Sequence, residues 1–289
     1  MFNPTKIVID AFVARVRDNY TRIYGDMRPE FLSVLDFVTR MTLENIANSD
    51  APYHDMEHTI MVTEVGQEVL RGKHVVEGGV SPRTWLNFVI SLLCHDIGYI
   101  RGVCRNDREP CYVTDFDGGT VTLARASTDA ALTPYHVTRA QIFVKERFQN
   151  ASLIDHEGII KNIEHTRFPY PDGGAAVTND SLPGILRASD LIGQLADVNY
   201  LKKIPRLFTE FQETGSNEVL GYATHADLRE SYPRFFWGMV SPYIDASLRY
   251  LNVTQEGKSW VASLHSHIFV EEHKLLGEGR TVRMPKPGD

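Results

Sequence analysis

A histidine and an aspartate stand side by side at His95 and Asp96, directly after the apolar run FVISLLC at 88–94. Such a run is typical of a buried helix, so the pair is expected where charge is costly. A buried ionised carboxylate must be paired, hydrogen-bonded or bound to a metal ion. Imidazole and carboxylate together suit a transition metal or a magnesium-like ion. The pattern therefore favours a metal site at Asp96 over an exposed dipeptide.

A second pair of histidines, His54 and His58, lies in the stretch YHDMEHTIMV. Asp50 is a suitable helix cap and Pro52 fits a first turn, so we expect both histidines on one helix. A spacing of i and i+4 places the two imidazoles on the same face, as a helix presents two groups to one site. An exposed pair at a polar helix start is the alternative. The spacing alone is weak support for a site.

Three further candidates lie at or within later segments that are expected to be helical. His136 begins an amphipathic stretch, where a simple polar helix start is an equally good interpretation. His165 ends an apolar-striped helix and is followed by a loop rich in glycine and proline, which repeats the pattern of His95. Asp190 belongs to a polar stripe on a largely apolar helix, and that stripe could face solvent or line a pocket. The stripe comprises Arg187, Asp190, Gln194 and Asp197.

Composition narrows the class of protein. The chain has 289 residues, 43% of them hydrophobic, and a net charge of −7, so it can bury a site but lacks the basic stripe that a nucleic-acid polymer would require. No apolar run is long enough for a membrane span, and no signal peptide is indicated. The three cysteines show no disulfide or zinc-ribbon spacing. We therefore expect a cytoplasmic protein that binds neither nucleic acid nor membrane.

The elements that must position these residues are helices. Apolar residues recur at helical spacing through most of the chain, and strand-like alternation is scarce. The pattern predicts an all-α protein of about ten helices. Beyond the two N-terminal helices, the helical stretches are expected near 56–71, 82–97, 137–149, 155–166, 182–197, 199–213, 226–250 and 257–274.

No linker divides the chain, so one helical domain is expected over 1–276. Its core lies at about 50–200, its flanking helices at 5–48 and 199–275, and a flexible tail at 277–289. Two irregular stretches, 101–135 and 167–184, follow the His95–Asp96 pair and His165 respectively. Loops of this length tend to be functional, so we expect the first of them to form a lid and both to carry specificity.

Taken together, His58, the HD pair at His95 and Asp96, and Asp190 resemble the signature of the HD-domain superfamily. These helical proteins are mostly metal-dependent phosphohydrolases. The stretch YHDMEHTIMV is also similar to the Tyr-His-Asn-x-x-His segment of cyclic-nucleotide phosphodiesterases, with Asp55 where that family has asparagine. In that family the first histidine protonates the leaving oxygen and the second binds metal, which implies those roles for His54 and His58.

His136 and His165 resemble the additional ligands of HD-domain subgroups that hold two metal ions. The resemblance implies two divalent ions bridged by Asp96, one also bound by His58, His95 and Asp190, the other by His136 and His165. Four imidazoles favour iron or manganese, with magnesium or zinc as alternatives.

The substrate implied is a small phosphorylated molecule such as a nucleotide. Arg167 and Arg101 are expected to neutralise phosphate charge, since a guanidinium matches phosphate oxygens, and Gln194 is expected to contact the substrate. Two other functions share this ligand set: a diiron oxygenase of the inositol-oxygenase type, and a non-catalytic nucleotide-binding regulatory module. The sequence carries no signal for oligomeric state.

Overall fold

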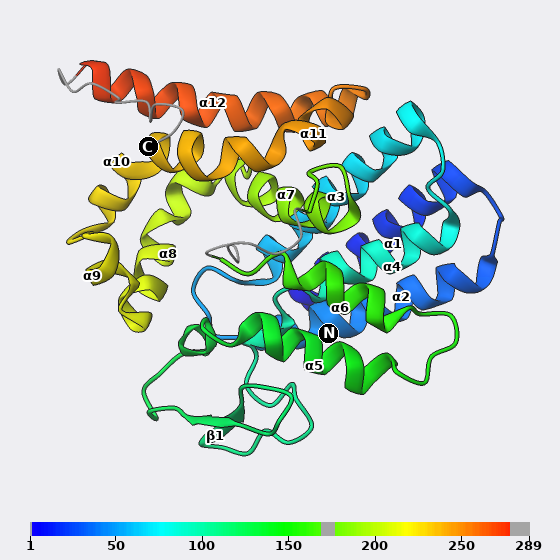
Figure 1. Ribbon diagram of the computed structural model, residues 1–289, viewed down its shortest axis with the longest axis horizontal. Coiled ribbons are helices and arrows are strands. Elements are labelled where there is room, and N and C mark those ends of the chain that lie inside the picture. The colour runs from blue at the N-terminus through cyan, green and yellow to red at the C-terminus, as the bar shows by residue number, and fades with distance from the viewer. Residues whose placement is uncertain (1, 169–176, 278–289) are drawn as a thin grey trace.

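The computed structural model describes residues 2–168 and 177–277 of the chain (Figure 1). Within these ranges the protein is all-α, as predicted, with one small two-stranded sheet. Each described helix is either too short or too polar to span a membrane. The α-helices are α1 Pro4–Tyr24, α2 Pro29–Ile46, α3 Met56–Glu77, α4 Pro82–Cys94, α5 His136–Phe148, α6 His156–Glu164, α7 Leu182–Leu195, α8 Tyr200–Thr214, α9 Ser216–Leu220, α10 His225–Phe235, α11 Ser241–Leu251 and α12 Gln255–Gly277.

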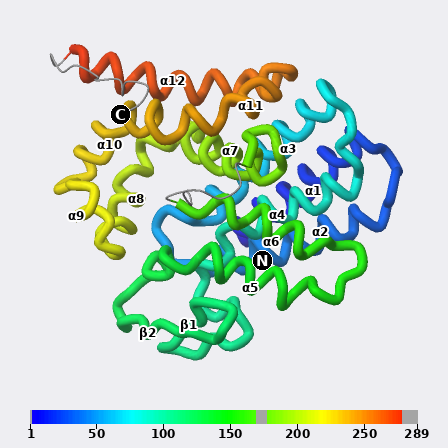
Figure 2. Tube along the Cα trace, viewed as in Figure 1, coloured from blue at the N-terminus to red at the C-terminus, as the bar shows by residue number. Residues whose placement is uncertain are grey.

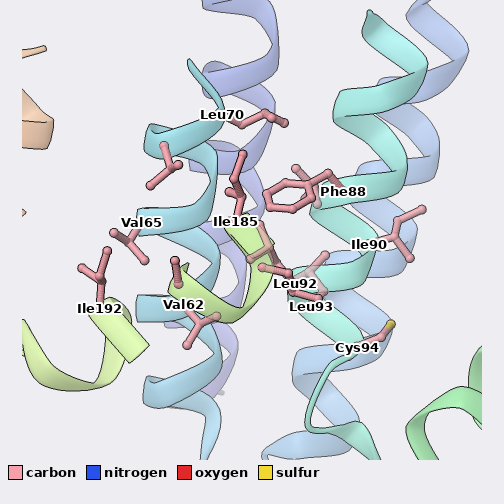
Figure 3. Packing of buried hydrophobic residues seen from close by; sticks show 14 of the residues in the cluster. Val62, Val65, Leu70, Phe88, Ile90, Leu92, Leu93, Cys94, Ile185 and Ile192 are labelled. Carbon is pink, nitrogen blue, oxygen red and sulfur yellow. The ribbon is translucent and has the colours of Figure 1, made fainter. Parts of the chain in front are cut away.

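The helices gather around α3, α4 and α7. Helix α3 packs against α7, α4 and α11, while α2 packs against α1 and α4, and α5 packs against α6 (Figure 2). In the view of Figure 1, α11 and α12 lie along the upper edge, and α5, α6 and the strands lie along the lower edge. The core is largely apolar where the three central helices meet; its side chains include Val62, Val65, Leu92, Leu93, Ile185 and Ile192 (Figure 3).

A close approach of α3 to α7 is possible because Gly193 has no side chain. A Cβ atom at this position would lie 2.8 Å from the Cα atom of Val62, which is closer than real contacts allow. Val62 lies one turn after His58, and Gly193 lies just under one turn after Asp190. The tight contact therefore brings the two candidate ligands together from different helices.

Helix α3 begins at Met56, as the apolar spacing predicts, but later than a cap at Asp50 would place it. Its N-cap is Asp55, whose carboxylate accepts a hydrogen bond from the backbone N–H of His58 at 3.0 Å. Asp50, the cap expected from sequence, instead accepts from the backbone N–H of Asp129 at 2.6 Å. His54 therefore precedes the helix, and the prediction that it shares a helical face with His58 is wrong. Both aspartates are good caps, and only the tertiary contact of Asp50 distinguishes them.

The helix predicted at 82–97 ends at Cys94, before the HD pair. A short 3₁₀ turn follows at Ile97–Tyr99. Gly98 lies within this turn, and its φ is not positive. A Cβ atom on Gly98 would overlap the carbonyl oxygen of His136, so the glycine is needed for close packing of this turn against the start of α5.

The single helix predicted at 226–250 is divided. Helices α10 and α11 are separated by a π-helical segment at Phe236–Val240. Pro242 lies in the first turn of α11, where a missing N–H donor is tolerated. It could not lie in the interior of one regular helix that runs through α10 and α11, because it would remove a backbone hydrogen bond. The tail predicted to be flexible lies, apart from Gly277, outside the described residues, as do 169–176 of the second predicted loop.

The stretch at 101–135 is partly ordered into a hairpin of β1 Cys111–Val113 and β2 Thr120–Thr122 and a 3₁₀ turn at Asp129–Leu132. Arg139 of α5 holds the start of the 101–135 stretch in place, and its side chain is fully buried. It contacts both carboxylate oxygens of Asp107 at 2.9 and 3.0 Å. It also donates to the carbonyls of Gly98, Ile100 and Val113 at 2.7 to 2.8 Å. We call these contacts the Arg139 clamp; they fix the segment from Gly98 to Val113, which is therefore not built as a lid.

Replacing Arg139 with leucine should lower the free energy of unfolding by about 3–5 kcal/mol, because Asp107 then stays buried without its partner. Urea unfolding followed by circular dichroism measures this. The matched control is Arg17→Leu, which breaks the exposed pair with Asp36 and should cost less than about 1 kcal/mol. Equal stability of the two variants would contradict the clamp.

Candidate metal centre

Four side chains from three helical elements converge on one point. His58 comes from the first turn of α3, His95 and Asp96 follow α4, and Asp190 comes from α7. The His58 Nε2 atom lies 3.2 Å from Asp96 Oδ2 and 3.3 Å from Asp190 Oδ1. The His95 Nε2 atom lies 3.1 and 3.6 Å from the same two oxygens. We call these four residues the metal cluster.

The inner atoms of the metal cluster lack hydrogen-bond partners. The Nε2 atoms of His58 and His95 and the Oδ2 atom of Asp96 are buried, and none makes a hydrogen bond despite the short distances. A buried polar atom left unpaired costs about 1–3 kcal/mol. Two imidazole nitrogens and two carboxylate oxygens around one point would all be satisfied by a divalent cation. The chemistry of the donor set therefore fits a metal ion.

Local hydrogen bonds orient the histidines. The Nδ1 atom of His95 lies 2.7 Å from the carbonyl oxygen of Leu92, and that of His136 lies 2.6 Å from the carbonyl oxygen of Thr133. A carbonyl can only accept, so each Nδ1 carries a proton, and in the neutral imidazole the lone pair is then on Nε2. Such bonds to the far nitrogen are the usual support of a metal-ligating histidine.

The charges of the metal cluster are strongly coupled. Burial opposes protonation of His58, but the carboxylates of Asp190 and Asp96 outweigh it and raise its pKa to about 9. Burial likewise opposes ionisation of Asp96, yet His95 and His58 hold its pKa well below the usual range. Without a cation, the cluster holds protons that a metal ion would displace on binding.

The second oxygen of Asp96 faces a different histidine. Its Oδ1 atom lies 3.8 Å from the Nε2 atom of His136, whereas Oδ2 faces His58 and His95. This is the arrangement that a carboxylate bridging two ions requires. Two groups of converging ligand atoms occur among the described residues, one of His54, His58 and Asp96 and one of His58, His95 and Asp190. Neither His136 nor His165 belongs to them, so the roles of both as metal ligands stay predictions. Burial and the nearby Arg187 cation lower the pKa of His165, and that positive charge also disfavours a metal ion beside it.

His54 is held by a glutamate that the sequence analysis did not find. The His54 Nδ1 atom lies 2.6 Å from Oε2 of Glu210, on α8. The other oxygen of Glu210 accepts the backbone N–H groups of Tyr53 and His54 at 2.7 and 3.1 Å. Burial opposes a charged imidazole, but Glu210 outweighs it and raises the pKa of His54. We call His54 and Glu210 the donor pair.

A signal for Glu210 was present in the sequence. The buried face of α8 includes Tyr200, Ile204 and Leu207, and Glu210 continues that stripe at helical spacing. A carboxylate on an apolar stripe needs a buried partner for the same reason as Asp96. The spacing does not indicate which partner, because His54 is far away in sequence.

Arg101 is not placed to bind a phosphate. Its guanidinium lies 2.5 Å from Asp129 and 2.7 Å from Asp50, and it donates to the carbonyl of Ser127. These contacts neutralise the charge of Arg101. They also link Arg101 to Asp50, which precedes His54, and to the chain at Ser127 and Asp129. The expectation that Arg101 neutralises substrate charge is therefore replaced by a structural role.

The other two expected substrate contacts also have partners within the chain. Arg167 binds Glu164 at 2.7 Å and Thr138 at 3.0 Å, although its side chain remains partly exposed. Gln194 hydrogen-bonds the side chain of Tyr200. The structure therefore gives neither residue a demonstrated place at the metal cluster, and their substrate roles stay predictions.

Comparison with known proteins covers almost the whole chain. A family model described as Npun_R2479-like matches residues 2–274. The chain belongs to the Npun_R2479-like family. No curated protein and no solved structure matches it. The metal cluster and the donor pair both lie within residues 2–274, which the family model matches. A fold family does not by itself determine a function, which depends on the chemistry of these residues.

Replacing His58 with alanine should weaken metal binding by at least about 100-fold, since loss of even a supporting residue commonly costs 10–100-fold. The matched variant His165→Ala should keep the metal affinity of the unchanged protein. Titration calorimetry with zinc and manganese, together with elemental analysis after gel filtration, measures both. Equal loss in the two variants would restore His165 as a ligand.

Proposed function

We propose that the chain is a metal-dependent phosphohydrolase of the HD-domain type that cleaves a phosphoester of a small molecule such as a nucleotide. The observation that carries the proposal is the unsatisfied metal cluster beside the donor pair. One supplies a place for a divalent cation, and the other supplies a proton donor. Hydrolysis of a phosphoester needs both, because a water must be activated and the leaving oxygen must gain a proton.

The metal cluster supplies the electrostatic part of the reaction. A divalent ion bound there lowers the pKa of a water and neutralises phosphoryl charge. His58, His95, Asp96 and Asp190 would hold it, and Asp96 Oδ1 with His136 marks the place for a second ion. The imidazoles favour iron or manganese, and zinc or magnesium are the alternatives. Asp190 is the most exposed cluster residue, with 25% of its side chain accessible, so we expect substrate to approach from its side.

The donor pair supplies the proton. With its pKa raised by Glu210, His54 is expected to be protonated near neutral pH. Its Nδ1–H then donates to Glu210, which leaves Nε2–H for the departing oxygen. The His54 side chain is 17% exposed, so a substrate can reach it, whereas that of Glu210 is 2% exposed. Glu210 thus orients the imidazole and stabilises its charge without meeting the substrate.

Two observations favour hydrolysis over the rival functions. A diiron oxygenase needs a redox-active pair of ions, and His165, an expected ligand of the second, lies outside the converging groups. A regulatory module that merely holds a nucleotide needs no proton donor, whereas His54 is bound to a buried carboxylate. Oxygen uptake with a polyol and no phosphatase activity would favour the oxygenase. Nucleotide binding without turnover would favour the regulatory module.

The direct test is a screen of phosphomonoesters, cyclic nucleotides and dinucleotides with the protein loaded separately with manganese, iron, zinc and magnesium. We expect turnover in at least one combination and its loss in Asp96→Ala, together with the loss of metal, because Asp96 is central to the cluster. His265→Ala, an exposed histidine on α12, is the control. Full metal content in Asp96→Ala would exclude the proposed site.

The donor pair has its own test. His54→Ala should keep its metal and lose turnover by about 10²–10⁴-fold, the usual contribution of a general acid. Glu210→Gln should also lose rate, since it removes the charge that favours the imidazolium. Glu213→Gln is the matched control, because Glu213 lies on the same helix but is exposed and binds Thr128. The measurement is the steady-state rate of each variant at saturating metal. A rate for His54→Ala equal to that of the unchanged protein would contradict the assignment of His54 as the proton donor.

A further inference from the structure

The ring of Tyr99 lies between two histidines of the candidate site. Its centroid is 4.5 Å from that of His54 with the planes 13° apart, and 4.4 Å from that of His136 with the planes 21° apart. Both contacts are stacked, within the range where aromatic rings attract one another. Tyr99 is only 2% exposed, so the ring is enclosed and has little room to move.

The backbone on both sides of Tyr99 is fixed by one guanidinium. Arg139 donates to the carbonyl of Gly98 at 2.7 Å and to the carbonyl of Ile100 at 2.8 Å. The next residue, Arg101, is bound to Asp129 at 2.5 Å. Hydrogen bonds to buried charged groups are among the stronger ones in proteins. The Arg139 clamp therefore holds the backbone on both sides of Tyr99 without any contact to His54 or His136.

The two outer rings are each held at one nitrogen. His54 is bound through Nδ1 to Glu210 at 2.6 Å, and His136 through Nδ1 to the carbonyl of Thr133 at 2.6 Å. The His54 ring also meets the rings of Tyr53 and His58 edge-on, at centroid distances of 5.2 and 5.4 Å. Stacking on Tyr99 adds a face-to-face contact to both histidines and limits their rotation. It also sets the separation between His54 and His136, whose Nε2 atom faces Asp96.

We propose that Tyr99 is a positioning residue whose ring holds the proton donor His54 at a fixed distance from the metal-binding side of the site. The effect of Tyr99 on reaction rate rests on the proposed function. Its effect on the positions of the His54 and His136 rings does not. We assign this role to the planar ring, and the phenol hydroxyl forms a separate hydrogen bond with Thr133. A displacement of a reacting group by about 1 Å can cost 10²-fold in rate, so the ring matters if His54 is the donor.

The kinetic test compares two aryl phosphoesters of the same class that differ in leaving group. Phenol departs poorly and needs a proton, whereas p-nitrophenol departs readily without one. Tyr99→Leu should slow the phenyl ester by about 10–100-fold, and the p-nitrophenyl ester by less than about threefold, because a good leaving group gains little from an acid. Tyr99→Phe should restore the phenyl rate, since it keeps the ring. In a His54→Ala background, Tyr99→Leu should add nothing.

The structural test uses nuclear magnetic resonance of the zinc-loaded protein. Stacking shifts the Cε1–H signals of His54 and His136 upfield, and Tyr99→Leu should return both downfield while Tyr99→Phe preserves them. The proton between His54 and Glu210 should exchange faster with water only in Tyr99→Leu. Tyr24→Leu removes another buried tyrosine, on α1, and should leave these signals unchanged if the effect is local.

The outcomes separate the two proposals. Equal slowing of both esters, or unchanged histidine signals in Tyr99→Leu with normal metal content, would overturn the positioning role while leaving phosphohydrolysis intact. Absence of turnover in the unchanged protein, together with altered histidine signals in Tyr99→Leu alone, would overturn the proposed function and retain Tyr99 as the residue that positions His54. If Tyr99→Leu fails to fold, Tyr99→Trp, which has a larger ring, is measured instead. We expect the Cε1–H signals of His54 and His136 to shift in this variant, and unchanged signals would contradict the positioning role.

Discussion

Burial of the Asp96 carboxylate is the constraint on which the site depends. The residue is 7% exposed just after a largely apolar helix, and its Oδ2 atom has no hydrogen-bond partner. An ionised carboxylate can be kept there only with strong compensation. Part of it comes from His95 and from His58 of α3, whose Nε2 atoms lie 3.1 and 3.2 Å from Oδ2. The close contact of Gly193 with Val62 brings a second carboxylate, Asp190 of α7, to the same two histidines. Core packing and site electrostatics are therefore one problem, because the helices that pack together gather two negative charges at one point.

The sequence predicted what depends on local pattern. Apolar spacing was enough for an all-α fold and for most helices, because burial of one helical face is encoded within a few turns. The apolar run before His95 and Asp96 was likewise enough to predict that the pair is buried. His58 and Asp190 lie beside this pair in the structure, in the grouping that the sequence predicts.

The failures share one physical cause, which is that the deciding contact is distant in sequence. His54 was wrongly placed on α3 because Asp50 and Asp55 are equally good caps until Asp50 binds Asp129 and Arg101. The order of the 101–135 stretch was missed because it depends on Arg139, one residue on a different element.

Because Glu210 binds His54, the candidate site includes a helix beyond residue 200. The core was expected at about 50–200, with the later helices as flanking additions. Yet the proposed proton donor precedes α3, outside any regular helix, and α8 supplies the carboxylate that holds its side chain and two backbone N–H groups. The four residues of the metal cluster all precede residue 200, whereas Glu210 follows it. On the proposed function, the central helices would therefore build the cation site, and the C-terminal part of the chain would orient the proton donor.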